Sequence, residues 1–203
     1  AERPDYGWLS EETEDDPKRL QKPACFILDP IDGTRSFIAG EPSWAHSFAT
    51  VQNGQVTTAV IYLPMLKRMY TATLGGGAKL NGEKIEMRTG RQMAAADILA
   101  ARPALEPLHW SGGKVPPFHR HHRPSLAYRM ALVAEGSFDG MITFRDTWEW
   151  DICAGALITS EAGAVVSDRR GENLTFNGAS AMTKGVIAAP QALHDEILNR
   201  LNI

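Results

Sequence analysis

The stretch "ACFILDPIDGT" occupies residues 24–34 and joins an apolar run to two acids that flank a proline. Its first five residues are apolar and end at a turn signal, which predicts a short buried strand. Pro30 fixes its own φ angle and favours an extended Asp29, so we expect the chain to leave the strand in a sharp turn. Such a turn would bring the carboxylates of Asp29 and Asp32 together with the Ile31 carbonyl.

Two interpretations of this turn follow from its residues. Carboxylates so close together raise each other's pKa unless a cation lies between them, and oxygen ligands without histidine or thiolate suit Mg²⁺ or Ca²⁺ better than Zn²⁺. The backbone N–H groups of Gly33 and Thr34 follow directly and could bind an anion. The alternative is an Asp-Pro turn in which the acid only accepts a local backbone bond. The local sequence leaves both open.

Composition limits the class of protein. The chain has 203 residues, with 43% hydrophobic and 22% charged residues, which is typical of a soluble protein of one large or two small domains. A net charge of −3 argues against binding to nucleic acid polymers or membrane surfaces. No apolar run approaches the roughly 20 residues that span a bilayer, and no signal-peptide pattern is visible. The two cysteines lie in apolar surroundings and predict reduced thiols. We therefore expect a cytoplasmic protein.

The first half of the chain predicts mainly strands. Asn53-Gly54 between two β-rich apolar runs is a strong hairpin signal, and it indicates an antiparallel meander. The strands expected in this meander are residues 45–52, 56–63 and 67–73.

The second half alternates strands and helices, which predicts a layered α/β or α+β architecture. Ser125 is the expected N-cap of one helix, Asp151 opens a second, and Pro190 begins a last one. The expected strands are residues 97–101, 138–144, 164–167 and 185–189, and the first two helices are residues 125–135 and 151–162.

Three motifs occur in a fixed order: "LSEE" at residues 9–12, "LDPIDGTRSF" at 28–37, and "WDICAG" at 150–155, followed by "EAGAVVSD". In this order they resemble the inositol monophosphatase family of metal-dependent, lithium-sensitive phosphatases, to which fructose-1,6-bisphosphatases and bisphosphate nucleotidases are related. The resemblance runs from Trp8 to the C-terminus.

The resemblance also implies a fold and a division of the chain. The fold is an αβαβα layered sandwich, with an N-terminal α+β part at residues 1–89 and a C-terminal α/β part at residues 90–203. In the family a helical region precedes the "LSEE" segment and contributes a Lys and an Asp near the metals. We expect this sequence to begin after that region.

The resemblance further implies a set of metal ligands. Glu11, Asp29 and the Ile31 carbonyl would bind one Mg²⁺ ion, and Asp29, Asp32 and Asp151 would bind a second, so that Asp29 bridges the two. Glu11 would also help to hold a third ion. The expected cofactor is thus two or three Mg²⁺ ions.

By the same resemblance, the Gly33 and Thr34 amides would hold the substrate phosphate, and the Thr34 hydroxyl would orient the attacking water. Glu11, Asp29 and Thr34 would be the catalytic residues. The expected substrate-binding set is Ile31, Asp32, Gly33, Thr34, Arg145 and Asp151.

The sequence supports three functional hypotheses. The first is a Mg²⁺-dependent phosphomonoesterase of the inositol-phosphate phosphatase type, which acts on a small phosphate ester by two-metal water activation. The second is a 3′(2′),5′-bisphosphate nucleotidase, because Arg145 replaces the acid that contacts inositol hydroxyls in the family and would suit a second phosphate. The third is a non-catalytic, metal-binding family member that serves as an interaction partner. The resemblance also implies a homodimer.

Three further features predict no chemistry of their own. Residues 75–77 are consecutive glycines without a following Gly-Lys-Ser/Thr, and we expect a turn there. The histidines of "FHRHHRP" at residues 118–124 fit no zinc spacing and predict a solvated basic loop. Trp44 and Trp110 are expected to be packing residues.

Overall fold

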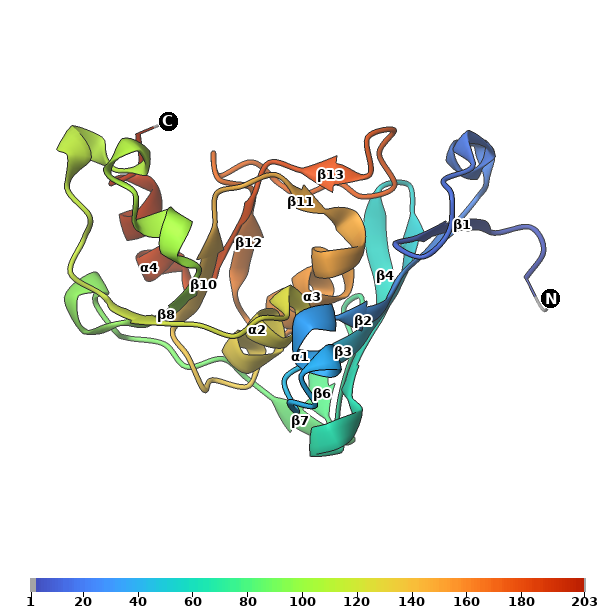
Figure 1. Ribbon diagram of the computed structural model, residues 1–203, viewed down its shortest axis with the longest axis horizontal. Helices are drawn as coiled ribbons and strands as arrows, with labels where there is room; N and C mark the ends of the chain where they lie inside the picture. The colour runs from blue at the N-terminus through green and yellow to red at the C-terminus, as the bar shows by residue number, and fades with distance from the viewer. Residues whose placement is uncertain (1–2, 203) are drawn as a thin grey trace.

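Two β-sheets enclose a pair of helices, and a further helix covers the far side of the second sheet (Figure 1). The structure is a computed structural model that describes residues 3–202. The layered α+β fold that the sequence predicts is confirmed. The domain boundary between residues 89 and 90 stays a prediction.

The first sheet contains seven strands in chain order. β1 pairs with β2 in parallel, and every following pair is antiparallel, which confirms the meander. Asn53 and Gly54 connect β3 to β4 with φ angles of 50° and 78°, as a two-residue hairpin requires. The strands are β1 (Gly7–Ser10), β2 (Cys25–Asp32), β3 (Ala45–Gln52), β4 (Gln55–Leu63), β5 (Arg68–Thr73), β6 (Ala78–Leu80) and β7 (Glu83–Ile85).

The second sheet is mixed and has the order β12-β14-β10-β8-β9. β8 runs parallel to both β10 and β9, whereas β14 is antiparallel to β10 and β12. Its strands are β8 (Asp97–Ala100), β9 (His119–His121), β10 (Gly140–Thr143), β12 (Val165–Ser167) and β14 (Val186–Ala189). A separate two-stranded ladder joins β11 (Thr147–Trp148) to β13 (Met182–Thr183).

The helices between the sheets approach each other closely. A Cβ added to Gly155 would lie 2.6 Å from the Met130 sulfur, so the small-residue run of the second helix is needed for this contact. Burial of apolar side chains on both sides of these helices forms the larger core, and a smaller core lies between the second sheet and the last helix. The helices are α1 (Thr34–Ile38), α2 (Leu126–Ala134), α3 (Glu149–Glu161) and α4 (Gln191–Leu198).

Short 3₁₀ segments occupy several connections: η1 (Pro17–Gln21), η2 (Pro64–Leu66), η3 (Met93–Ala95), η4 (Arg102–Leu105), η5 (Pro107–His109) and η6 (Ser111–Gly113). Both cysteines are buried free thiols, as predicted. Within residues 3–202, no helix is both long and apolar enough to cross a membrane.

Two local expectations about the helix starts have different outcomes. Ser125 caps α2 as predicted, because its hydroxyl accepts a bond of 2.9 Å from the Tyr128 amide. The expectation that Asp151 opens α3 is wrong. That helix begins at Glu149, directly after β11 ends at Trp148, which is its N-cap. Asp151 therefore lies inside the first turn.

Candidate metal centre

Three carboxylates from two distant parts of the chain meet at one point. Asp29 and Asp32 belong to β2, and Asp151 lies in the first turn of α3. One oxygen from each lies within 4.8 Å of an oxygen of the other two. Asp29 is only 1% exposed and Asp32 is also buried. This is the group that the sequence places around Mg²⁺, although Glu11 is outside it.

A β-bulge explains why Asp29 and Asp32 share one face of the sheet. Residues three apart in a regular strand point to opposite faces. Here Asp29 pairs with Ser47 and Asp32 pairs with Ala45, so β2 holds one more residue than β3 between these two pairs. Since Ser47 and Ala45 point to the same face, their partners do too. The sequence predicted that the strand ends at residue 28; it continues to Asp32, and Pro30 lies within the bulge instead of in a loop.

Local hydrogen bonds orient the two β2 acids. The Ser125 hydroxyl and the Ala127 amide both donate to Asp32 Oδ2, at 2.6 and 2.7 Å, which leaves Oδ1 for another ligand. The Ile31 amide donates to Asp29 Oδ1 at 2.8 Å. The Asp-Pro turn with a local backbone bond is therefore present together with the acid cluster, and the two interpretations of the turn do not exclude each other.

No cationic side chain among residues 3–202 pairs directly with the cluster, and the pKa values of its acids are raised. Burial, followed by the neighbouring Asp32, raises the pKa of Asp29 to about 9 and that of Asp151 to about 8. Burial also raises the pKa of Asp32 to about 6, although the Ser125 hydrogen bond opposes the shift. Among residues 3–202, none of the three forms an ion pair with Lys, Arg or His. A set of converging oxygen donors without a protein cation fits a hard divalent ion such as Mg²⁺.

Glu11 lies at the edge of this group. β1 pairs with β2 in parallel register up to Ser10 and Leu28, so the next residue, Glu11, is beside Asp29. Its amide still approaches the Leu28 carbonyl at 3.4 Å, but its side chain is exposed. Its negative charge contributes to the raised pKa of Asp29. A role as a metal ligand for Glu11 stays a prediction.

The residues after Asp32 form a tight turn into α1. Gly33 has φ +93°, and a Cβ there would lie 3.2 Å from the Ser43 carbonyl oxygen, so this position requires glycine. α1 begins at Thr34, and amides in a first helical turn have no partner inside their helix. The exposed Thr34 hydroxyl donates to the Ile31 carbonyl at 3.1 Å. These groups border the acid cluster on the side where the sequence predicts a phosphate.

A sequence profile described as the inositol monophosphatase family matches residues 1–202. The chain belongs to the inositol monophosphatase family. It is 35% identical over 178 residues to the inositol-1-monophosphatase of Rhizobium meliloti, an alignment that covers 83% of this chain and 65% of that protein. It is 32% identical over 188 residues to the Nus factor SuhB of Escherichia coli, which covers 87% and 69% respectively. The chain thus spans about two thirds of the length of these relatives.

Solved structures of the family share the fold. The extragenic suppressor protein suhB from Bartonella henselae superimposes with a TM-score of 0.83 at 29% identity, over 98% of this chain and 80% of that one. The family thus includes proteins named for a phosphatase activity and proteins named for another role.

Two arginines lie near the acids of this family member. Arg145 is exposed in the loop between β10 and β11, and its charge opposes the rise in the pKa of Asp151. Arg129 on α2 is buried, and its charge opposes the rise in the pKa of Asp32. Burial lowers the pKa of Arg129 itself to about 10. Arg145 was identified from the sequence, whereas Arg129 was missed because a single arginine in an otherwise apolar helix has no motif.

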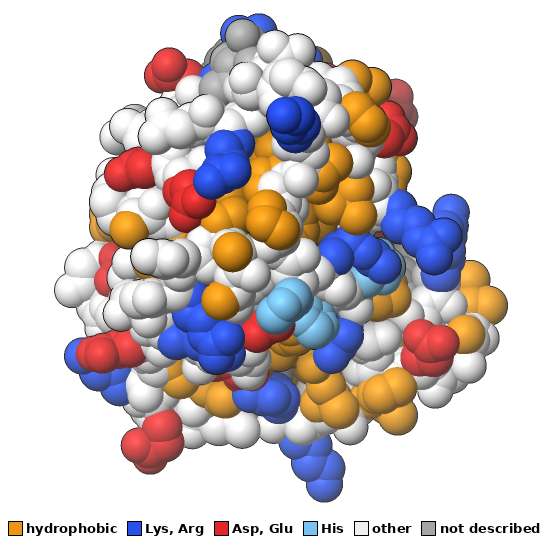
Figure 2. Space-filling view, turned by 90° about the vertical axis from the view of Figure 1, so that its left-hand side faces the viewer, with side chains coloured by type: hydrophobic (Ala, Val, Ile, Leu, Met, Phe, Trp, Pro, Cys, Tyr) orange, Lys and Arg blue, Asp and Glu red, His pale blue; other side chains and the backbone are white. Residues whose placement is uncertain are grey.

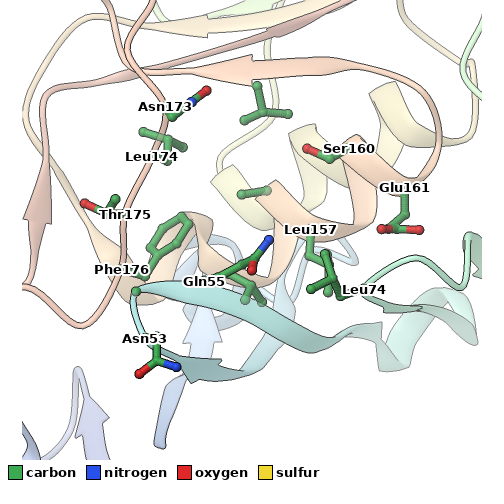
Figure 3. Close-up of a pocket in the computed structure, with 14 residues that line it drawn as sticks. Asn53, Gln55, Leu74, Leu157, Ser160, Glu161, Asn173, Leu174, Thr175 and Phe176 are labelled. Carbon is green, nitrogen blue, oxygen red and sulfur yellow. The ribbon is translucent and has the colours of Figure 1, made fainter.

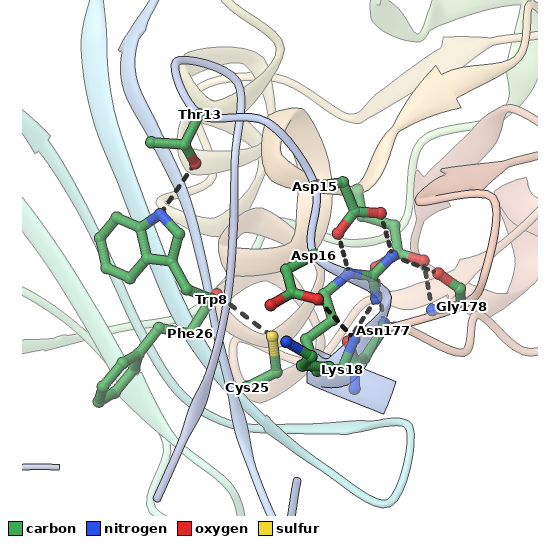
Figure 4. Close-up of polar contacts among 11 residues, drawn as sticks. Trp8, Thr13, Asp15, Asp16, Lys18, Cys25, Phe26, Asn177 and Gly178 are labelled. Carbon is green, nitrogen blue, oxygen red and sulfur yellow. Dashed lines mark hydrogen bonds and ion pairs between the residues drawn. The ribbon is translucent and has the colours of Figure 1, made fainter. Parts of the chain in front are cut away.

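Sequence reasoning also missed a polar network around a buried arginine. Asp15, Asn177 and Gly178 surround one guanidinium group, that of Arg19 (Figure 4). Glu149 binds the same 177–178 turn from α3. Only the juxtaposition of segments about 158 residues apart creates this network, so no local pattern could have revealed it.

The triple glycine is a turn, as predicted, and its amides are already bound. Both oxygens of Glu161 accept bonds of 2.7 Å, one from the Gly75 amide and one from the Gly77 amide. Trp110 is buried in the smaller core, as expected of a packing residue. Trp44 is half-buried and packs edge-on against the exposed Phe37, so its packing role stays a prediction.

The histidine-rich segment differs from its expectation. His119–His121 form the edge strand β9 instead of a loop, because their backbone pairs with β8. His121 Nε2 lies 2.9 Å from Asp97 Oδ1, and His122 Nε2 lies 3.0 Å from a guanidinium nitrogen of Arg129. Figure 2 shows histidine side chains among Lys and Arg side chains on this face. The segment is basic and largely exposed, as predicted, but it is structured.

A cavity of about 400 Å³ lies at the opposite end of α3 from the acids. Its walls come from the β3–β4 turn, the last turns of α3 and residues 173–176 (Figure 3). Leu157, Leu174 and Phe176 contribute apolar surface, and Glu161 at its edge is already bound to the glycine turn. The α3 residues in its wall, Ala156 to Glu161, lie roughly 8–15 Å along the helix axis from Asp151, and none of the three acids lines the cavity.

Proposed function

We propose that the protein is a Mg²⁺-dependent phosphomonoesterase that acts on a small phosphorylated metabolite. The observation that carries the proposal is the cluster of the buried Asp29 and Asp32 with the half-buried Asp151, which has no ion-pair partner among the described residues. Membership of the inositol monophosphatase family also supports a phosphatase activity.

Five residues of the chain would bind the metal ions. Asp29, held by the Ile31 amide, and Asp32, held by α2, present fixed oxygens, and Asp151 completes the set from α3. Glu11 and the Ile31 carbonyl would extend it toward further ions. Bound there, Mg²⁺ would supply a water of lowered pKa and neutralise charge on the phosphoryl oxygens.

The remaining groups would bind the substrate. The Gly33 and Thr34 amides would donate hydrogen bonds to the phosphate at the start of α1, since backbone donors there are suited to anions. The Thr34 hydroxyl, now bonded to the Ile31 carbonyl, would orient the attacking water. No covalent intermediate with the protein is required, because in-line attack by water is sufficient.

A specific observation favours a second candidate, a 3′(2′),5′-bisphosphate nucleotidase. Arg145 lies close enough to Asp151 to affect its pKa, and it is exposed and so accessible to a substrate. A guanidinium beside the reacting phosphate would suit a second phosphate of the same substrate. A third candidate, a metal-binding protein without turnover, is favoured by the 32% identity to a Nus factor.

The test is phosphate release from a panel of inositol 1-phosphate, fructose 1,6-bisphosphate and adenosine 3′,5′-bisphosphate, with and without Mg²⁺ and with added Li⁺. We expect Mg²⁺-dependent release that Li⁺ inhibits, and its loss in Asp151→Asn. Asp146→Asn is the matched control, because Asp146 is exposed, pairs with Lys184 at 2.6 Å and lies outside the cluster.

The outcomes separate the three candidates. Arg145→Ala should impair only the bisphosphates if the nucleotidase hypothesis is right. Mg²⁺ binding without release of phosphate from any substrate would favour the non-catalytic member. The proposal fails as a whole if calorimetry detects no Mg²⁺ binding that depends on Asp151.

A further inference from the structure

We propose that Arg19 and Glu149 are positioning residues that hold Glu11 and Asp151 in place relative to Asp29. The inference rests on the proposed function, because the site that they shape is the proposed Mg²⁺ site. Asp29 is fixed by the sheet, whereas Glu11 and Asp151 lie just beyond the end of a strand and in the first turn of a helix. Those two positions need another constraint.

Arg19 is the first half of that constraint. Its side chain is buried, with 2% of the residue exposed, and its guanidinium binds three partners. Nε lies 2.6 Å from Asp15 Oδ1, one terminal nitrogen lies 2.6 Å from Asn177 Oδ1, and the other lies 2.9 Å from the Gly178 carbonyl oxygen (Figure 4). The planar guanidinium has donors in fixed directions that match these three acceptors. A lysine ammonium group could not bind all three in this arrangement.

Glu149 is the second half, and it is 1% exposed. Its two oxygens accept bonds from the Asn177 amide at 2.6 Å and from the Gly178 amide at 2.9 Å. Arg19 thus binds the oxygen atoms of the 177–178 turn, and Glu149 binds its N–H groups. A Cβ on Gly178 would lie 3.2 Å from Glu149 Oε1, so the turn and the carboxylate are in close contact.

Each half is connected to the metal centre along the backbone, Glu149 through the first turn of α3 and Arg19 through β1 from Gly7 to Glu11. Glu149 is the first residue of α3, and Asp151 follows in the same turn. The Arg19 side of the network contacts β1. A Cβ on Gly7 would lie 2.8 Å from the Arg19 Cβ, so the strand lies directly against this residue. β1 ends at Ser10, immediately before Glu11. The network therefore links the start of α3 to β1 through one turn.

The competing explanation is a structural role only, in which the network stabilises the fold without affecting the acids. Glu161 provides a matched control for it. Glu161 is on the same helix and also accepts two backbone amide bonds, but it lies at the far end of α3 from Asp151. Glu161→Gln, like Glu149→Gln, replaces a carboxylate that accepts two backbone amide bonds, but it does so far from Asp29, Asp32 and Asp151.

The experiment measures Mg²⁺ affinity by calorimetry together with melting temperature and kinetics. We expect Glu149→Gln and Arg19→Lys to raise the Kd for Mg²⁺ at least tenfold, and saturating Mg²⁺ to restore most of kcat. Glu161→Gln should lower the melting temperature and leave the Kd unchanged. Arg19→Lys keeps the charge, so it tests the geometry even if Glu149→Gln fails to fold.

Two results would overturn the inference, and they differ. If both variants bind Mg²⁺ as tightly as the wild type while they melt earlier, the network is structural only and the proposed function stands. If the wild type itself binds no Mg²⁺ at the three acids, the proposed function fails and the inference fails with it.

Discussion

Each of the two main sheets carries acids at the end of its strands, but the two groups are compensated differently. In the second sheet Asp97 begins β8 and Asp139 immediately precedes β10. The Arg88 guanidinium lies between them, 2.6 Å from Asp139 and 3.2 Å from Asp97, and His121 lies 2.9 Å from Asp97. In the first sheet none of the acids of β2 forms an ion pair among residues 3–202, and the charge of the buried Arg129 only partly offsets the rise in the pKa of Asp32.

The difference appears in the acidity of the two groups. The His121 hydrogen bond holds the pKa of Asp97 below its ordinary value, whereas burial and the neighbouring acids raise the pKa of Asp29 to about 9. The same side chain type is thus stabilised as a carboxylate at the start of β8 and destabilised within β2. An acid cluster that the fold leaves uncompensated indicates a site for an external cation.

The largest effect should come from Asp29→Asn, which removes the most strongly perturbed acid of the uncompensated group. We expect Mg²⁺ affinity to fall by at least about a hundredfold and phosphate release to disappear, because a neutral amide neither attracts nor bridges cations. Calorimetry and the phosphate-release assay measure the two losses. If the variant bound Mg²⁺ normally, the comparison between the sheets would not identify the metal site.

The next effect is a pH dependence of the metal-free protein. The folded pKa values of Asp29, Asp32 and Asp151, about 9, 6 and 8, all lie above the ordinary 3.8. The folded state therefore holds protons more tightly than the unfolded state, and its stability falls as the pH rises from about 4 toward 9. We expect the melting temperature in EDTA to fall over this range, and Mg²⁺ to reverse most of the fall at high pH.

Asp29→Asn provides the control for that experiment, since it removes one of the titrating groups. The variant should lose less stability than the wild type between pH 5 and pH 8 in EDTA, and it should melt at the higher temperature at pH 8. An equal fall in both proteins would show that other groups cause the pH dependence.

A smaller effect concerns Asp32, the acid of the cluster that accepts two hydrogen bonds from the start of α2. Ser125→Ala removes both the N-cap of α2 and the bond of 2.6 Å to Asp32. We expect a loss of about 1–2 kcal/mol in the free energy of unfolding, measured by urea denaturation, because cap removal alone costs about this much. Mg²⁺ affinity should fall only a few-fold, since the Ala127 amide still binds Asp32. Unchanged stability would show that the cap contributes nothing here.

Much of this architecture follows from local sequence. The Asn53-Gly54 hairpin, the Ser125 cap and the alternating strands of the meander depend on neighbours in the chain, and the structure confirms them. The bulge in β2 was not predicted, because it depends on the pairing of Asp29 and Asp32 with β3. A proline in a strand indicates an irregularity but not which residues will face the core.

The residues of the site likewise fall into those that the sequence predicted and those that it did not. The motifs predict that Asp29, Asp32 and Asp151 belong together, and the structure brings them together. Arg129 and Glu149 were not predicted, because each gains its role only from partners that the fold supplies. A buried charge is recognisable from sequence only when a motif accompanies it, and neither residue has one.

The smallest effect should come from Asp97→Asn in the compensated group. Its ion pairs are partly exposed, so we expect a loss of less than about 1 kcal/mol in the free energy of unfolding at neutral pH. The sign of its pH dependence is opposite to that of the first sheet. A pKa held below the ordinary 3.8 contributes stability above that pH, and the contribution is lost as the pH falls through the folded pKa. Wild type and variant should therefore converge in urea denaturation as the pH falls below the folded pKa of Asp97, and their Mg²⁺ affinities should be equal. A change in Mg²⁺ affinity would contradict the separation of the two groups, because it would mean that the acids of the second sheet also affect the metal centre.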